Sequence, residues 1–172
     1  MENIIVARVL RDKPVEVTPS SIVKNKAVKL KTTNHRVYGF KTKEVYDALI
    51  ASGIANLQSV KISYNWKEMP SDMMFYFVID KRTSAVKAQV CIGGKDSRKA
   101  YTPMEMVVFS GRMKACNLSE AIAKILEAEY RPELGRLLIS TKQLNDRDVT
   151  ALKSAGFVEY SENIQCMMYS NS

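Results

Sequence analysis

The sequence predicts an α+β fold in which two antiparallel, strand-rich repeats are each closed by a helix and are followed by a C-terminal α/β extension. Three observations support this prediction. Several runs alternate apolar and polar residues, as half-buried strands do. A threonine that can cap a helix follows each set of runs, and the tail has a separate helix–strand–helix pattern. We therefore expect residues 1–118 to form the repeat domain and residues 119–172 to form a helix–strand–helix–strand extension packed on it.

The first repeat contains two short strands and a helix. In residues 28–33, Val28 and Leu30 face one way while lysines face the other, which predicts a half-buried strand with a basic outer face. Residues 36–40 predict a second strand. Thr42 is a suitable N-cap, and an apolar stripe at helical spacing ends at Gly53, so a helix is expected between them.

The second repeat has the same order of elements. Strands are expected at residues 59–67, 73–80 and 85–93, with a turn at 80–84. Thr102-Pro103-Met104-Glu105 then has the form of a capping box with proline at the first helical position, which predicts a helix over 102–116 although residues 107–109 resemble a strand. Its buried stripe would consist of Met106, Phe109, Met113 and Cys116.

The tail predicts a helix at residues 120–130, a strand at 136–140 and a capped helix from Asn145 that ends at Gly156. Two short strands, near 158–160 and 164–169, are expected to complete the chain. This segment is acidic, so we expect it to pack or mediate contacts rather than to bind phosphate.

The charge of the chain favours a polyanionic partner. Of the 172 residues, 26 are basic and 18 acidic, for a net charge of +8. The excess lies in two segments: residues 1–43 hold ten bases and three acids, and residues 81–114 hold eight bases and two acids. Such concentration is typical of proteins that bind nucleic acid or another polyanion.

Several function classes are disfavoured by what the sequence lacks. No apolar run approaches the length of a membrane span, and the first residues do not resemble a secretory signal, so a soluble, cytoplasmic protein is expected. His35 is the single histidine, and Cys91, Cys116 and Cys166 are widely spaced, which disfavours a metal centre, a catalytic triad and a disulfide framework. We expect no cofactor and no catalytic residue.

The candidate site is a basic groove with flat side chains on which bases could stack. The bases expected to line or flank this groove are Lys24, Lys26, Lys29, Lys31, Arg36, Lys61, Lys67, Lys87, Lys95, Arg98 and Lys99. The candidate stacking residues are Tyr38, Tyr76 and Tyr101. Lysine neutralises phosphate without reading sequence, so low sequence specificity is expected.

Two stretches resemble the Whirly family of single-stranded nucleic-acid-binding proteins. "VKNKAVKL" (23–30) is similar to a lysine-rich strand of that family, with Asn25 where glycine is usual, and "TPMEMVVFSGRMKAC" (102–116) is similar to the helix that closes its second half. The resemblance covers about residues 15–118 and extends to Whirly-like RNA-binding proteins of nucleus-forming large phages. It implies a non-catalytic protein that binds single-stranded RNA, or less favourably single-stranded DNA, as a homo-oligomer and without a membrane.

Two alternatives come from other classes. The tail resembles the closing helix, strand, helix and Gly-Phe of the GNAT acetyltransferases, in which an R-x-x-G-x-G/A loop holds the pyrophosphate of coenzyme A. The corresponding stretch, 112–117 ("RMKACN"), has neither glycine, and the helix expected at 102 lies where that fold requires a strand. The other alternative is a phage inhibitor module whose basic strands bind an acidic protein.

Overall fold

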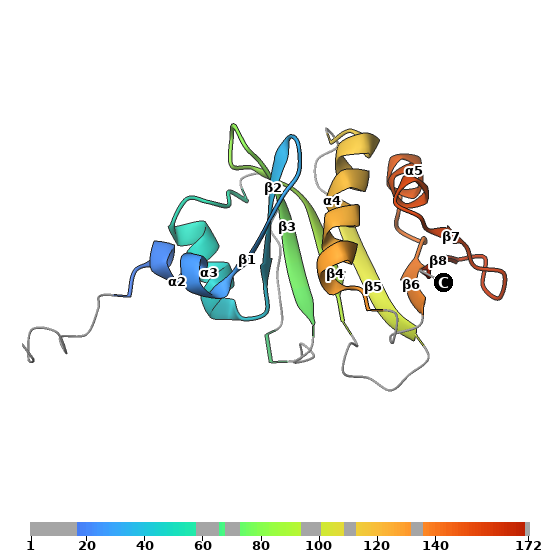
Figure 1. Cartoon of the computed structure of the whole chain (residues 1–172), viewed down its shortest axis with the longest axis horizontal. Helices are drawn as coiled ribbons and strands as arrows, with labels where there is room; N and C mark the ends of the chain where they lie inside the picture. The colour runs from blue at the N-terminus through green and yellow to red at the C-terminus, as the bar shows by residue number, and fades with distance from the viewer. Residues whose placement is uncertain are drawn as a thin grey trace, which may run out of the picture.

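The computed structural model describes residues 17–57, 66–67, 73–93, 101–108, 113–131 and 136–170, with residues 101–108 described by their backbone. One eight-stranded sheet runs through this part of the chain, with helices on its faces (Figure 1). The strands are β1 (Val28–Lys31), β2 (His35–Phe40), β3 (Met74–Asp80), β4 (Val86–Ile92), β5 (Tyr101–Val108), β6 (Arg136–Ser140), β7 (Val158–Glu159) and β8 (Cys166–Tyr169). The described helices are α2 (Pro19–Lys26), α3 (Lys43–Ala51), α4 (Ala115–Glu129) and α5 (Asp146–Ser154).

The sheet has the order β1-β2-β3-β4-β5-β6-β8-β7. Neighbouring strands are antiparallel except β5 and β6, which run parallel. A parallel pair needs a crossover connection, and α4 provides it between these two strands. The parallel join therefore lies where the chain leaves the sheet, passes through a helix and returns.

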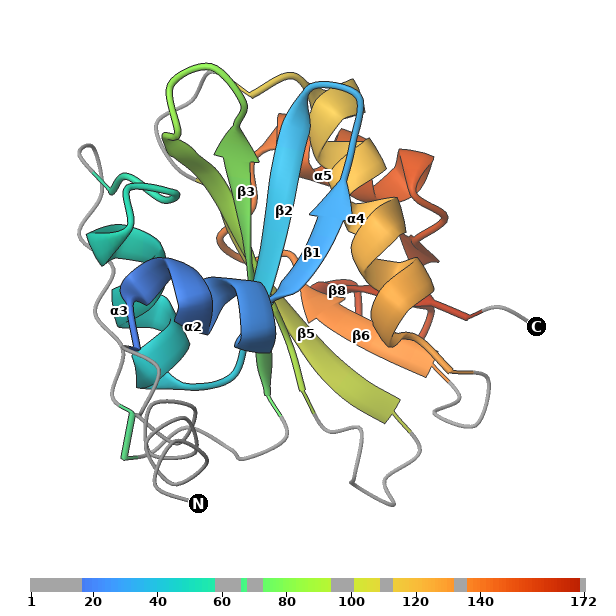
Figure 2. The same cartoon turned by 60° about the vertical axis from the view of Figure 1, so that its left-hand side comes forward.

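Two apolar cores lie on opposite faces of the sheet. Along β3, Tyr76 and Val78 pack with α4 and α5, while Phe75 and Phe77 pack with α2 and α3. All four side chains are buried, because β3 is covered on both faces. Figure 2 shows α2 and α3 on one side of the strands and α4 on the other.

Local signals explain most of the elements. Thr42 and Asn145 accept hydrogen bonds from the third residues of α3 and α5, as their N-cap roles predict. Gly53 and Gly156, expected to end these helices, have φ angles of +79° and +106°, which favour glycine. The strands predicted at 73–80, 85–93 and 136–140 and the two short C-terminal strands are also confirmed, with bounds that differ by at most two residues. The α+β class is therefore confirmed.

The helix predicted over 102–116 is wrong. Residues 101–108 form β5, and the helix begins only at Ala115. Tertiary pairing overrides the capping signal, because β5 lies between β4 and β6 and its backbone groups bond to both. Pro103 is tolerated since the ladder with β4 begins at the next residue, Met104.

The basic segment also differs from its prediction. Residues 23–26, which the Whirly resemblance assigned to a lysine-rich strand, form the end of α2, and the strand is limited to Val28–Lys31. Thr18 and Ser21 form a capping box at the start of α2, with proline at the first helical position. This local signal begins a helix immediately before the strand-like alternation of residues 28–31.

The sheet is continuous across the predicted domain boundary. Strands β6, β8 and β7 extend the sheet of β1–β5, and α4 begins at Ala115, before residue 118. The division into two domains at that residue stays a prediction. The strand expected at 59–67 falls mostly outside the described residues. None of the described helices is long and apolar enough to cross a membrane.

Candidate functional site

The parallel pair β5 and β6 is joined over a short stretch only. Residues 101–103 pair with residues 136–138, whereas β5 continues to Val108 and β6 to Ser140. Beyond this ladder, β5 pairs with β4 and β6 pairs with β8. The carboxyl-terminal parts of the two strands are therefore not bonded to each other, and we call the place where they separate the β5–β6 opening. Crevices at the carboxyl ends of parallel strands are common ligand sites.

The N-terminus of α4 follows β5 closely in the chain. Its N-cap, Lys114, makes no side-chain capping bond, and the first turn holds no acidic residue. The first hydrogen bonds of the helix are those from the backbone N–H groups of Asn117 and Leu118 to the Lys114 carbonyl. The backbone N–H groups of Ala115 and Cys116 precede these bonds and have no acceptor within the described part. Each of the other described helices has a side-chain cap. An uncapped helix N-terminus, with its partial positive charge, favours an anion.

The structure brings four of the predicted groove residues together. Lys29, Lys31, Arg36 and Tyr38 line one hollow of about 370 Å³ with Lys81. The other predicted bases are dispersed. Lys24 and Lys26 lie on α2, Lys67 is on an exposed turn, and Lys87 lines a different cavity. Lys61, Lys95, Arg98 and Lys99 fall outside the described residues, as does the side chain of Tyr101.

Two predicted site residues already have partners in the protein. Tyr76 is fully buried and its hydroxyl donates a hydrogen bond to Glu129, so its ring is not available to a base. Burial raises the pKa of Tyr76 to about 12. The ammonium of Lys26 lies 2.6 Å from the carboxylate of Glu44. The predicted stacking role of Tyr76 is therefore wrong. Both faces of β3 are covered, so the position of a residue in the sequence of this strand does not indicate whether its side chain is exposed.

The prediction missed Lys114, Ala115 and Cys116 as candidate site residues. The signal was present, because 112–117 is the stretch compared with a pyrophosphate-binding loop. The helix expected from residue 102 would have placed these residues in its last turn instead of at a helix start. Among the described residues, no group of three His, Cys, Asp or Glu side chains is arranged to hold a metal ion.

Comparisons with known proteins place this architecture in one fold class. The chain is similar to the structure of a ribosomal-protein-S5-alanine acetyltransferase from Vibrio fischeri, at 11% identity and a TM-score of 0.56, over 84% of this chain and 97% of that one. It is also similar to a protein from Bordetella pertussis described as a GNAT-family acetyltransferase, at 11% identity and a TM-score of 0.51, over 83% and 99% of the two chains.

A further similar structure is that of an E. coli protein described as an N-acetyl transferase, bound to coenzyme A. The identity is 9% and the TM-score 0.51, and the match covers 81% of this chain and all of that one. No family profile matches the sequence. No curated protein matches it either. The likeness is therefore one of fold, and the fold is that of the GNAT acetyltransferases.

This likeness overturns the main functional prediction. The chain does not share a fold with the Whirly-like proteins named above, and the single sheet with a parallel β5–β6 join replaces the two predicted repeats. The predictions of a non-catalytic protein and of single-stranded RNA or DNA as its partner rested on the two basic segments and on that resemblance, and they are wrong. The acetyltransferase alternative fits the fold, and the objection that residue 102 begins a helix is removed by β5.

Proposed function

We propose that this protein binds a coenzyme A thioester at the β5–β6 opening and transfers its acyl group to an amine. The observation that carries the proposal is the uncapped N-terminus of α4, which follows the carboxyl end of β5, where β5 and β6 are no longer paired. Support comes from the similar structures, of which one is an acetyltransferase and another holds coenzyme A.

The chemistry of the ligand fits this end of α4. The pyrophosphate of coenzyme A is a dianion, and the free amides of Ala115 and Cys116 are donors of the kind that hold phosphates at helix starts. Lys114 adds an exposed positive charge. The stretch 112–117 has no glycine, so these two amides would hold the pyrophosphate without a glycine-rich loop.

The reaction proposed is an acyl transfer in which the neutral amine nitrogen attacks the thioester carbonyl. The carbon–sulfur bond breaks as the carbon–nitrogen bond forms, the amine loses one proton, and coenzyme A leaves as the thiol. The role of the chain in this step is to position the thioester against the acceptor, which lowers the entropic part of the barrier.

Binding is tested with two nearly isosteric variants of Cys116, an exposed residue in the first turn of α4. Cys116→Asp should weaken the binding of acetyl-coenzyme A by about tenfold or more, because its charge opposes the pyrophosphate. The same charge should stabilise the helix by about 0.3–1 kcal/mol. Cys116→Asn is the control and should bind within about twofold of the wild type.

Isothermal titration calorimetry measures the affinities, and urea unfolding measures the stabilities. Equal affinities of the Asp and Asn variants would remove the start of α4 from the site. Undetectable binding of acetyl-coenzyme A to the wild type would reject the proposed function.

Turnover requires a separate measurement. Release of coenzyme A should be followed by chromatography with amines and peptides as acceptors, because Cys116 is exposed and would react with a thiol reagent. Saturable release that depends on an acceptor supports acyl transfer. Binding without any transfer would leave the coenzyme A site in place and reject the reaction.

A further inference from the structure

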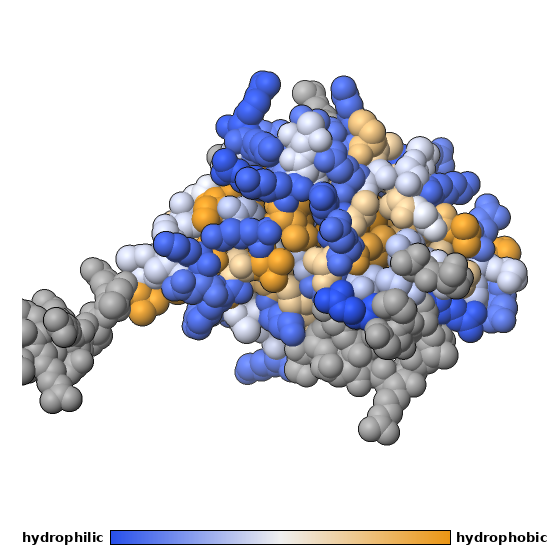
Figure 3. Space-filling view, viewed as in Figure 1, coloured by the Kyte–Doolittle hydropathy of each residue, from blue (hydrophilic) through white to orange (hydrophobic). Residues whose placement is uncertain are grey.

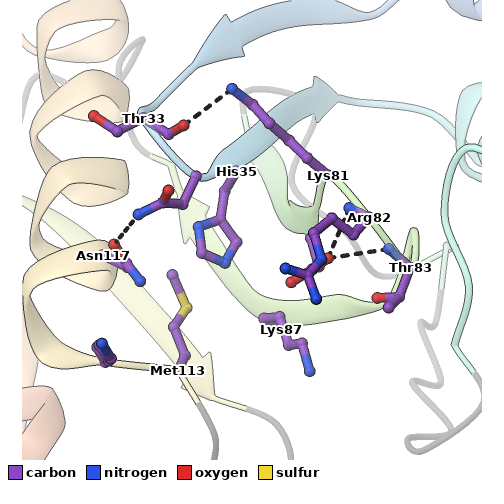
Figure 4. Close-up of a pocket in the computed structure, with 11 residues that line it drawn as sticks. Thr33, His35, Lys81, Arg82, Thr83, Lys87, Met113 and Asn117 are labelled. Carbon is purple, nitrogen blue, oxygen red and sulfur yellow. Dashed lines mark hydrogen bonds between the residues drawn. The ribbon is translucent and has the colours of Figure 1, made fainter.

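A cavity of about 700 Å³ lies beside the start of α4 (Figure 4). Its walls come from the β1–β2 turn, the β3–β4 turn and the first residues of α4. These three segments meet at one end of the sheet in Figure 1, and Figure 3 shows hydrophilic side chains protruding there. We call it the His35 cavity. Its volume is typical of sites for small molecules.

His35 lines this cavity from the start of β2. The residue is 5% exposed, and its Nδ1 has no hydrogen-bond partner among the residues that the structure describes. Figure 4 shows the ring between Asn117 on one side and Lys87 on the other. A buried nitrogen without a partner is costly, which suggests that a bound molecule completes the arrangement.

Lys87 enters the cavity because of a β-bulge. Val78 pairs with Ala88 and Ile79 pairs with Val86, so Lys87 is an extra residue in β4. The bulge separates its two neighbours, since Ala88 packs in the core under α4 and Val86 in the core on the opposite face. Bulges of this kind re-aim a side chain and are frequent beside functional sites.

The charge of the cavity is strongly positive. Four cations line it, Lys81, Arg82, Lys87 and Lys114, against the single carboxylate of Asp80. That carboxylate already accepts hydrogen bonds from the backbone N–H groups of Arg82 and Thr83. Burial raises the pKa of Asp80, but these bonds outweigh burial and lower it overall. Within the described residues, Arg82, Lys87 and Lys114 have no acidic partner.

The walls are held in place before any ligand binds. The side chain of Asn34 donates to Asn117 at 3.0 Å, and the backbone N–H of Thr33 donates to Glu120 at 2.6 Å. The ammonium of Lys81 donates to the Thr33 carbonyl at 3.2 Å. These bonds join the β1–β2 turn to α4 and to the β3–β4 turn, so the backbone walls of the cavity need little reorganisation to bind a ligand.

We propose that the His35 cavity, which shares Lys114 with the start of α4 but does not include Ala115 or Cys116, binds the phosphate group of a phosphorylated small molecule. The buried imidazole, the lysine at the bulge and Arg82 would contact the dianion, and the rest of the cavity would hold the molecule that carries it. Guanidinium and ammonium groups are the usual phosphate ligands of proteins. This site stands whether or not the chain transfers acyl groups.

His35 offers a direct probe, because it is the single histidine of the chain and its imidazole gives one set of NMR signals. Sulfate is a suitable ligand, since it stays a dianion between pH 5 and pH 8. Burial lowers the pKa of His35, with Lys87 and Lys81 lowering it further and Asp80 and Glu120 opposing them. Arg82 and Lys114 also line the cavity.

A bound dianion favours the imidazolium, so sulfate should raise the pKa of His35 by about one unit. By linkage, sulfate should bind more tightly below that pKa and more weakly above it. The measurement is a pH titration of the imidazole signals in sulfate and in chloride of equal ionic strength. A pKa that is the same in both salts would overturn the proposal.

Charge removal locates the effect. Lys87→Gln and Arg82→Gln should each reduce the affinity for sulfate by about tenfold. Lys124→Gln is the matched control, since Lys124 is exposed on α4, pairs with Glu127 and does not line the cavity. If all three variants reduced the affinity for sulfate equally, the cause would be the net charge of the protein, and the site would be rejected. His35→Gln should abolish the pH dependence, with folding checked by circular dichroism.

The phosphate has two sources, coenzyme A itself or a separate molecule. Coenzyme A and dephospho-coenzyme A, which lacks the 3′-phosphate, distinguish them. If the His35 NMR signals shift with coenzyme A but not with dephospho-coenzyme A, the cavity binds the 3′-phosphate of coenzyme A. If they shift with adenosine monophosphate but with neither form of coenzyme A, the cavity binds a separate ligand. No His35 shift with any of the three, together with none in sulfate, would reject the site even if acetyl-coenzyme A binds at the β5–β6 opening.

Discussion

Gly39 lies in β2 against the ring of Tyr76. A Cβ at Gly39 would stand 2.8 Å from the Cζ of Tyr76, a distance that requires the ring to move. The ring is fully buried and its hydroxyl is hydrogen-bonded to Glu129, so the ring cannot move without disturbing the core. Glycine is therefore required here by the space available and not by backbone conformation, since its φ is not positive.

Gly39→Ala is expected to lower the free energy of unfolding by about 1–3 kcal/mol, because overpacking a core displaces well-fitted side chains. Gly93→Ala is the matched control. A Cβ at Gly93 would meet the flexible end of Met73 at 3.1 Å, which can move aside. Urea unfolding of both variants measures the difference, and an equal small effect would show that Tyr76 is less tightly held than the structure indicates.

Tyr76→Phe tests the hydroxyl bond between the sheet and α4. Burial raises the pKa of Tyr76 from 10 to about 12 in the folded protein, so the wild type loses stability as the pH rises from 10 towards 12. By pH 11 this loss should be about 1 kcal/mol, and the phenylalanine variant should not show it. Unfolding curves from pH 8 to 11 give the two slopes; identical slopes would contradict a raised pKa.

The helix starts differ in how they are stabilised. Asn145 accepts from the backbone N–H of Asp148 at 2.9 Å, and Asp148 accepts from the backbone N–H of Asn145 at 3.3 Å. Lys114 makes no such bond at the start of α4. The first arrangement favours the fold, whereas the second leaves donors for a ligand.

Asn145→Ala should therefore cost about 0.5–2 kcal/mol of unfolding free energy, the usual cost of losing an N-cap. Lys114→Ala removes no capping bond and should change the unfolding free energy by less than about 0.5 kcal/mol. Thermal or urea unfolding measures both. A larger loss in the lysine variant would mean that its side chain, and not the backbone, holds the start of α4.

β5 shows where local signals fail at the scale of one element. Thr102 and Pro103 fit the start of a helix, and the residues that follow are compatible with one. The strand forms because a place between β4 and β6 satisfies its backbone and removes it from water. That place is created by residues far along the chain, so no window around residue 102 could indicate it. The helices at Thr42 and Asn145 were predictable because their signals and their surroundings agree.

Across the whole molecule, the sequence predicted most strands and helices but not the order and pairing of the strands in one sheet. The alternation of Val86–Ile92 and the apolar run of Met74–Asp80 required only neighbouring residues to interpret. The parallel join of β5 to β6 depends on a crossover through α4.

The candidate sites depend on that topology too. His35, Lys87 and Lys114 are distant in sequence and meet only because three connections lie at one end of the sheet. Charge clustering indicated that basic residues matter, yet it could not separate those that line a cavity from those on an open face.

The strand β1 stands at one edge of the described sheet and pairs with β2 on one side only. Its outer side presents backbone groups that a strand from another molecule could join. Lys29 and Lys31 are exposed on this short strand, and lysines at sheet edges oppose such joining by repulsion and by their hydration. The basic run is therefore suited to keeping copies of the protein from aggregating through their edges, a role in colloidal stability that needs no ligand.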